Sequence, residues 1–372
     1  MTIDKARPVP LNALDRQTRH GLDERFAQAF ERVMRSGWFV LGREVAAFEE
    51  EFAAYCGVAH AIGVGNGSDA LELAIAALDL PQGSEIAVAP NAAMYATLAI
   101  LANGFEPRFV DVDPETATID ADAFERTLTP RTRAVVVTHL YGRLADIGAI
   151  LERDATRHIT VIEDCAQAHG AARGGRKAGS FGRMGCFSFY PTKNLGALGD
   201  GGAVVTSDAT TAARLRQLRQ YGWTSKYDVG LAHGRNSRLD ELQAALLREK
   251  LPLLDEWNRR RRAIAQRYGN GIRHARIRTP APGGEDDVAH LYVVRSDGRD
   301  ALRAHLAARG IATDIHYPIP DHRQRVFGGR YGDLQLPQAE ALAREALSLP
   351  CFPELGDDEV DAVIEACNEW TA

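Results

Sequence analysis

The chain has 372 residues, of which 45% are hydrophobic and 25% are charged, and its formal net charge is −6. This length exceeds that of one small core and suits a large domain with a smaller one attached. The acidic balance gives no basis for nucleic-acid binding, which usually needs a basic patch. The most apolar stretch, residues 86–102, is interrupted by Pro90 and is too short to cross a bilayer, so no membrane association is predicted.

The first two thirds of the chain alternate short apolar runs with helical patterns. The predicted helices are residues 22–34, 45–55, 69–78, 95–103, 121–128 and 147–157. The predicted strands are residues 60–64, 85–89, 107–112, 134–138, 160–163, 186–189 and 202–206. This alternation predicts βα units and a mostly parallel sheet that helices cover on both faces.

A long helical pattern follows over residues 239–268, and the texture then changes at a loop rich in proline and glycine, residues 280–284. Beyond it we predict strands at 290–294 and near 311–315, and helices at 299–309, 339–346 and 357–369. We therefore predict an α/β chain with a large domain, residues 1–245, and a small C-terminal α+β domain, residues 246–372.

The five cysteines are widely spaced and form no CxxC pair. This spacing argues against a disulfide framework and against a zinc site, so no metal is expected. Together with the absence of a signal peptide, it predicts a cytoplasmic protein. The one basic cluster, the arginine run 259–262, is expected to form a solvated helix face or an oligomer contact.

The segment GNGSDAL, residues 65–71, stands between a predicted strand and a predicted helix. Its two glycines let the backbone approach a ligand, and Ser68 or Asp69 can cap the helix. The free N–H groups of a first helical turn can hold a phosphate. An ordinary capped turn without a ligand is the alternative, and the glycine spacing is not that of a dinucleotide fingerprint.

Two further segments carry candidate chemistry. Asp164 ends an apolar strand, where side chains of a parallel sheet face the ligand crevice, and it can keep a cationic ring nitrogen protonated. Lys193 lies in a glycine-rich turn between two strands, where its amine can form a Schiff base. Taken singly, each residue could instead be structural: Asp164 as a helix cap and Lys193 as a turn residue.

Together these segments resemble the DegT/StrS family of sugar aminotransferases, which have the fold-type I architecture of enzymes dependent on pyridoxal 5′-phosphate (PLP). The resemblance spans nearly the whole chain. The similar stretches are GNGSDAL (65–71), EDCAQAHGA (163–171), FSFYPTKNLGALGDGGA (187–203), NSRLDELQAA (236–245), HYPIPDH (316–322) and PQAEALAREALSLPCFP (337–353).

The resemblance implies a role for each matching residue. Lys193 would carry PLP and act as the catalytic base and acid, and Asp164 would pair with the ring nitrogen. Gln167 would lie near the ring hydroxyl. The residues expected around the cofactor phosphate are Gly67, Ser68, Asp69, Ser188 and, from a neighbouring subunit, Asn236. The active site would then be shared between two chains of a homodimer.

The chain departs from the family at the aromatic residue that stacks on the cofactor ring. Ungapped alignment places Ala93 at that position, whereas Tyr95 lies two residues later. We expect Tyr95 to stack on the ring through a local shift of the helix start. The alternative is that Tyr95 is a core aromatic residue and another group covers the ring.

The resemblance also implies the substrates. L-glutamate would donate the amino group and a nucleotide-linked keto-sugar, most closely a dTDP-3-keto-6-deoxyhexose, would accept it with ping-pong kinetics, and Tyr317 and His322 are candidate substrate contacts. A C4 keto-sugar or cyclitol aminotransferase is an alternative. A dehydratase relative would have histidine in place of Lys193, and a non-catalytic PLP-binding regulator would not need Lys193, Asp164 and Gln167 together.

Overall fold

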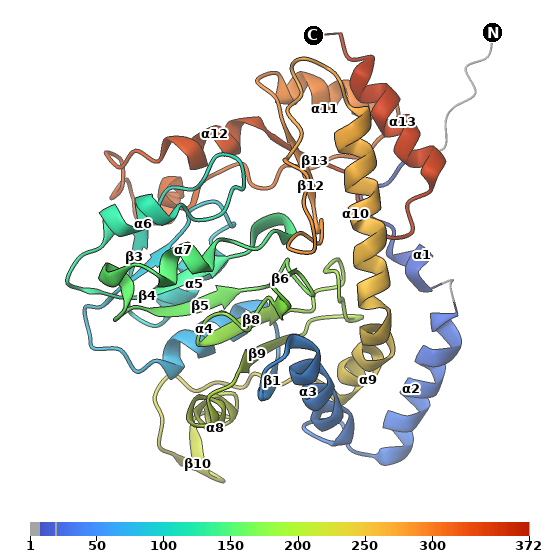
Figure 1. Ribbon diagram of the computed structural model, residues 1–372. Helices are drawn as coiled ribbons and strands as arrows, with labels where there is room; N and C mark the ends of the chain where they lie inside the picture. Colours follow the sequence, from blue (N-terminus) through green and yellow to red (C-terminus); the bar gives the residue numbers. More distant parts are fainter. Residues whose placement is uncertain (1–7, 19–20, 372) are drawn as a thin grey trace.

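The structure, a computed structural model, describes residues 8–18 and 21–371. Its centre is a seven-stranded sheet with the order β1-β9-β8-β5-β4-β2-β3 (Figure 1). The strands are β1 His60–Val64, β2 Glu85–Val88, β3 Glu106–Phe109, β4 Thr132–Thr138, β5 Thr160–Asp164, β8 Met184–Ser188 and β9 Gly202–Thr206. Only β9 runs against its neighbours, β1 and β8, so the predicted mostly parallel sheet is confirmed.

Helices cover both faces of this sheet because its strands are apolar on both sides. The helices up to residue 250 are α1 Leu14–Thr18, α2 Leu22–Ser36, α3 Arg43–Cys56, α4 Gly67–Ala77, α5 Tyr95–Ala102, α6 Ala121–Thr127, α7 Ile147–Leu151, α8 Ala209–Leu218 and α9 Glu241–Lys250. One buried cluster joins the sheet to α4, α5, α6, α7 and α8. A second cluster joins the opposite face to α3 and α9. Successive residues of β8 divide between the two: Cys186 packs in the first and Phe187 in the second, as the period of a strand requires.

The C-terminal part packs around a smaller core of its own. Its elements are α10 Leu254–Gly271, β12 Tyr292–Arg295, α11 Arg299–Ala308, α12 Pro337–Glu345, β13 Ala346–Leu349 and α13 Asp357–Asn368. β12 and β13 pair antiparallel, and α10, α11 and α13 pack about them (Figure 1). Val9 and Ala13 from the start of the chain join this core. α12 instead packs on the core of the large sheet through Ala339 and Leu342.

Short elements complete the chain. They are the strand pairs β6 Ala172–Arg173 with β7 Arg176–Lys177 and β10 Trp223–Ser225 with β11 Asp228–Val229, and the 3₁₀ turns Leu140–Gly142, Asp154–Thr156, Leu251–Leu253, Asp321–Arg323 and Arg325–Phe327. The helix predicted over residues 147–157 is thus only α7 followed by a 3₁₀ turn.

The long helix predicted over residues 239–268 is wrong in one respect, because it is interrupted at Leu251–Leu253. Pro252 stands there and has no N–H to donate to the preceding turn. The proposed domain boundary at residue 245 falls inside α9, which packs against α2 and α3. Leu251 and Leu254, on either side of the interruption, still pack in the cluster of the large sheet, whereas Ile264 of α10 packs in the C-terminal core.

Two other expectations are corrected. The strand predicted near 311–315 makes only two isolated bridges, Ile311 with Val9 and Asp314 with Ser348. The helix predicted over 339–346 ends at Glu345, and Ala346 begins strand β13. The arginine run is not a uniformly solvated face either. Arg261 is buried and its Nη1 donates to the Cys351 carbonyl at 2.6 Å.

Candidate active site

The carboxyl ends of β1, β5 and β8 meet at one edge of the sheet. In the ladder, Val64 of β1 and Ser188 of β8 both lie opposite Gly202 of β9. Asp164 ends β5, the strand next to β8. The three sequence segments with candidate chemistry therefore converge where ligands bind in parallel α/β sheets.

The N-terminus of α4 forms an open anion site. Asn66 caps the helix, since its side chain accepts from the Asp69 N–H at 2.8 Å, and the Ala70 N–H donates to the Asn66 carbonyl. Within the described part of the chain, no hydrogen bond uses the amides of Gly67 and Ser68. Two free N–H groups at the positive end of an 11-residue helix suit a phosphate.

Ser188 closes this site from the side. A Cβ on Gly67 would lie 2.6 Å from the Ser188 Cβ, so only glycine permits the close approach of the two segments. The Ser188 hydroxyl accepts from the Tyr190 N–H at 3.3 Å and keeps its proton free to donate. The Asp69 carboxylate is already engaged, because it accepts from the Ser237 hydroxyl at 2.6 Å and lies 3.5 Å from Arg235. Asp69 thus shapes the turn rather than offering a free group.

Asp164 is a buried carboxylate with few partners. It accepts from the Ala166 N–H at 3.1 Å and from the Thr138 hydroxyl at 3.3 Å, and no ion pair reaches it within the described residues. Burial raises its pKa, and the Ala166 and Thr138 hydrogen bonds and the Lys193 charge oppose the rise only in part. A cationic partner such as a protonated pyridine would stabilise the charged form of a carboxylate buried in this way.

Lys193 lies in the turn that joins β8 to β9, and its N–H donates to the Tyr190 carbonyl. Burial lowers the pKa of its amine to about 8, and the Asp164 charge partly opposes this. Near neutral pH a larger fraction of the amine is therefore free of its proton than in an ordinary lysine. The neutral amine is the form that attacks a carbonyl.

Asn194, beside Lys193, fixes the position of this turn, and the sequence did not point to it. Its side chain donates to Asn258 at 2.8 Å and to the Val288 carbonyl at 3.2 Å, and its oxygen lies 2.9 Å from His290 Nδ1. These partners come from α10 and from the segment before β12. The small domain therefore holds the lysine turn in place.

Gln167 and Tyr317 meet although 150 residues separate them. The Gln167 amide donates to the Tyr317 hydroxyl at 3.0 Å, and its oxygen accepts from the Tyr141 N–H at 2.6 Å. The segment HYPIPDH thus reaches the site through Tyr317.

Tyr95 begins α5, and its side chain is 51% exposed, so it is not a core residue of this chain. Tyr95 lies close enough to Tyr317 to affect its titration. Burial is the main cause that raises the pKa of Tyr317, and Tyr95 is the second. Ala93 and Met94, just before it, both have left-handed backbone angles, φ 57° and 67°. These two residues turn the chain so that the helix starts at Tyr95.

Asp321 holds this turn from the small-domain side, and the sequence did not point to it either. Its carboxylate accepts from the Met94 N–H at 2.9 Å and from the Thr97 hydroxyl at 2.6 Å. Its own N–H donates to the Pro90 carbonyl at 2.7 Å. Burial raises the pKa of this carboxyl to about 6.

Asp321→Asn should therefore change how stability depends on pH. Because the pKa is higher in the folded chain, the native state holds the proton more tightly, and this contribution is complete below about pH 4 and is lost as pH rises through about 6. From about pH 4 to 7, the wild type should lose roughly 2 kcal/mol of stability relative to the variant. Urea unfolding of both proteins at both pH values measures the difference in their free energies of unfolding. A difference that is the same at both pH values would contradict the prediction.

Two predicted site residues lie apart from this cluster. Asn236 is exposed, next to Ser237, whose hydroxyl accepts from the Gly65 N–H at 2.9 Å. It is thus near the α4 turn but faces outward. His322 is buried, lies 3.0 Å from Glu340 and packs beside Phe109. No contact connects His322 to Lys193 or Asp164 within the described residues, so its substrate role has no support here.

One buried group of side chains has the composition of a metal site: His139, Glu163 and Cys165. His139 and Glu163 are already engaged in hydrogen bonds. The Ala145 N–H donates to His139 Nδ1, so the other ring nitrogen carries the proton toward Glu163, 3.0 Å away. Glu163 also accepts the N–H groups of three residues in the next turn, Gly179, Phe181 and Gly182. His139 and Glu163 thus belong to a structural hydrogen-bond network.

The site thus combines an open anion site at a helix N-terminus, a buried carboxylate and an amine of lowered pKa. The DegT/DnrJ/EryC1/StrS aminotransferase family matches residues 20–368. The chain belongs to this family. It is 46% identical to the dTDP-3-amino-3,4,6-trideoxy-alpha-D-glucose transaminase of Streptomyces venezuelae, over 92% of this chain and 91% of that protein.

Solved structures of family members have the same fold. The S. venezuelae DesV structure, in complex with a ketimine intermediate, superposes with a TM-score of 0.94 at 44% identity, covering 98% of this chain and 99% of that one. NtdA from Bacillus subtilis, with bound cofactor PMP, superposes with a TM-score of 0.90 at 30% identity, covering 98% of this chain and 86% of that one. The family member described here is a PLP-dependent aminotransferase with the fold-type I architecture expected from the sequence. None of the helices in residues 8–18 and 21–371 is both long and apolar enough to cross a membrane.

Proposed function

We propose that this aminotransferase moves an amino group from L-glutamate to the keto carbon of a dTDP-linked 3-keto-6-deoxyhexose, giving an amino-deoxy sugar nucleotide. The observation that carries the reaction type is the convergence of Lys193, Asp164 and the open N-terminus of α4 at one edge of the sheet. The sugar is inferred from the S. venezuelae transaminase, whose name places the amino group at C3.

The residues present fit PLP. When bound, the cofactor supplies a ring that withdraws electrons from the substrate carbon. The amides of Gly67 and Ser68 and the Ser188 hydroxyl would bind its phosphate. Asp164 would keep the ring nitrogen protonated, and in return its own charge would be stabilised. Gln167 would lie at the ring hydroxyl.

Lys193 would carry the catalytic proton. Its amine would hold the cofactor through the aldehyde. Once a substrate amine takes that place, the Lys193 amine would serve at the substrate Cα, first as base and then as acid. A pKa near 8 lets the same group take and return a proton close to neutral pH.

Aromatic side chains would complete the site. Tyr95 is proposed to stack on the cofactor ring, because it is exposed at the start of α5 and lies near Tyr317. If the Tyr95→Ala variant binds the cofactor with unchanged affinity, Tyr95 does not stack on the cofactor ring. Tyr317, which contacts Gln167, is the better placed of the two proposed substrate residues.

We further propose a homodimer with shared active sites. Asn236 is exposed and adjoins the α4 turn through Ser237, so it can reach the corresponding turn of a second copy. A group of apolar residues on α2, in the loop that follows it and in the β8–β9 turn is also exposed: Phe30, Met34, Trp38, Phe39, Tyr190 and Leu198. Such a surface suits burial between subunits.

The substrate assignment is tested by the product. Purified holoenzyme, L-glutamate and a panel of dTDP- and UDP-linked 3-keto and 4-keto sugars and a keto-cyclitol are incubated, and the products are identified by mass spectrometry and NMR. We expect fast conversion of a dTDP-3-keto-6-deoxyhexose to its 3-amino product. Preferred conversion of a 4-keto sugar or of a cyclitol would instead support the corresponding alternative.

A further inference from the structure

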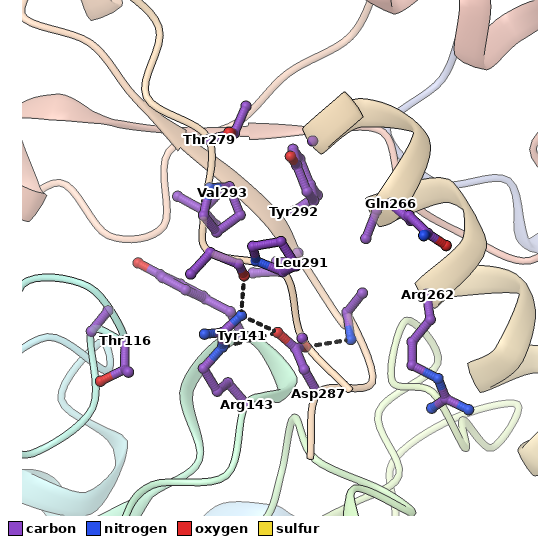
Figure 2. A pocket seen from close by; sticks show the side chains of 18 of the residues that line it. Thr116, Tyr141, Arg143, Arg262, Gln266, Thr279, Asp287, Leu291, Tyr292 and Val293 are labelled. Carbon is purple, nitrogen blue, oxygen red and sulfur yellow. Dashed lines mark hydrogen bonds and ion pairs between the residues drawn. The ribbon is translucent and has the colours of Figure 1, made fainter. Parts of the chain in front are cut away.

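A second cavity lies between α10 and the large domain, and the proposed chemistry does not use it. Its volume is about 610 Å³, within the usual range for small-molecule sites. Its walls come from residues 114–117 and 140–143, from one face of α10, and from the segment 278–295 (Figure 2). Among the described residues proposed to hold the cofactor, none lines it.

One short segment, residues 289–291, separates this cavity from the lysine turn. Ala289 and Leu291 line the cavity. His290, between them, faces the other way and lies 2.9 Å from the side chain of Asn194, the neighbour of Lys193. The backbone of this wall is held to the large domain, since the Leu291 N–H donates to the Tyr141 carbonyl at 3.1 Å. The cavity and the lysine turn therefore lie on opposite sides of this segment.

The cavity walls are largely apolar but contain a buried polar group without a partner. Tyr141, Pro280, Leu291 and Val293 contribute apolar surface. Tyr292 is 4% exposed, and its hydroxyl has no hydrogen-bond partner within the described part of the chain. The nearby Thr279 side chain opposes the rise in the Tyr292 pKa that burial causes, but it does not lie in hydrogen-bonding geometry. A buried hydroxyl without a protein partner is available to bind a ligand group.

The charges around the cavity are unequally paired. Five arginines and three carboxylates line it. Arg143 pairs with Asp287 at 3.0 Å, and Arg278 and Arg295 both pair with Glu345. Arg259 and Arg262, one turn apart on α10, form no ion pair or hydrogen bond in the part of the chain described. The two unpaired carboxylates, Glu115 and Glu285, lie on the exposed walls across from α10.

We propose that this cavity is a second ligand site, for an amphipathic organic anion. An aromatic or apolar body would lie against Tyr141 and the proline-containing loop. A carboxylate, sulfonate or phosphate group would meet Arg259 and Arg262, which both line the cavity from α10, because a guanidinium group binds such anions with paired hydrogen bonds. The Tyr292 hydroxyl would donate to an acceptor on the ligand body. This site does not depend on which sugar the enzyme converts.

The test uses 8-anilino-1-naphthalenesulfonate, an aromatic anion whose fluorescence rises on binding, with the holoenzyme. We expect saturable binding at one site per chain, weakened at least about tenfold in the double variant Arg259→Gln, Arg262→Gln. Ala263→Trp, which places an indole in the cavity from an exposed position of α10, should also remove it. Arg309→Gln, at a surface arginine that directly follows α11, is the control and should bind as the wild type does.

Three outcomes would overturn the proposal. The first is the absence of saturable binding to the holoenzyme. The second is equal affinity in the wild type, the double arginine variant and Ala263→Trp, which would place the probe elsewhere. The third is competitive displacement of the probe by dTDP, which would place it in the sugar-nucleotide site. Transaminase activity is not a readout, so failure here leaves the proposed function untouched.

Discussion

Replacing Lys193 by alanine is expected to lower transamination by more than about 10⁴-fold while the chain stays folded. The variant loses both the amine that attaches to the cofactor and the group that moves the proton. The turn around it should persist, because Asn194 holds it through Asn258, Val288 and His290. Steady-state kinetics and circular dichroism measure the two effects.

Lys250 offers a matched control. It is also buried, and burial lowers the pKa of its amine to about 8 as well. Its Nζ, however, donates to the Gly196 carbonyl at 2.7 Å and to Gln17 at 2.8 Å, so it is engaged in the fold. Lys250→Met should reduce stability but leave turnover per folded chain close to that of the wild type. Loss of activity in Lys250→Met with retention in Lys193→Ala would reverse the assignment.

Asp164→Asn should lower the rate by about 10²–10³-fold with little change in fold. An amide has nearly the same shape as the carboxylate but cannot balance a protonated ring nitrogen, so the ring would withdraw electrons less well. Thr138→Val is the matched control, since it removes only the hydroxyl that donates to Asp164 at 3.3 Å. Thr138→Val should lower the rate of transamination by less than about tenfold.

Both variants should still take up the cofactor, because the phosphate site at α4 and Lys193 are intact. The rate of the first half-reaction with glutamate, followed by absorbance in single-turnover experiments, separates loss of chemistry from loss of binding. An Asp164→Asn enzyme with half or more of the wild-type rate would contradict the role given to this carboxylate.

The sequence predicted the catalytic edge well because each signal there is local. An apolar run ends at Asp164, and a glycine turn follows the predicted strand that precedes Gly67. The parallel sheet then brings these ends together without any knowledge of distant contacts. The bounds of β1 and β9 were predicted as the structure has them.

What could not be predicted depends on contacts between distant segments. Asp321 caps the turn before Tyr95 from 224 residues or more along the chain, and no periodicity reports such a pair. The 311–315 run has the composition of a strand, but only two of its residues find partners. The interruption of the long helix at Pro252 could have been predicted, because a proline inside a helical pattern interrupts the helix. The cavity beside α10 joins three separate segments, so no single motif marks it.

The most direct test of the central claim is to identify the lysine that carries the cofactor. The chain has five lysines, and Lys193 and Lys250 both have lowered pKa values. The holoenzyme is reduced with borohydride and digested, and the peptides are analysed by mass spectrometry. We expect the phosphopyridoxyl group on the peptide that contains Lys193 and on no other. The same group on the Lys250 peptide, with Lys193 unmodified, would contradict the account.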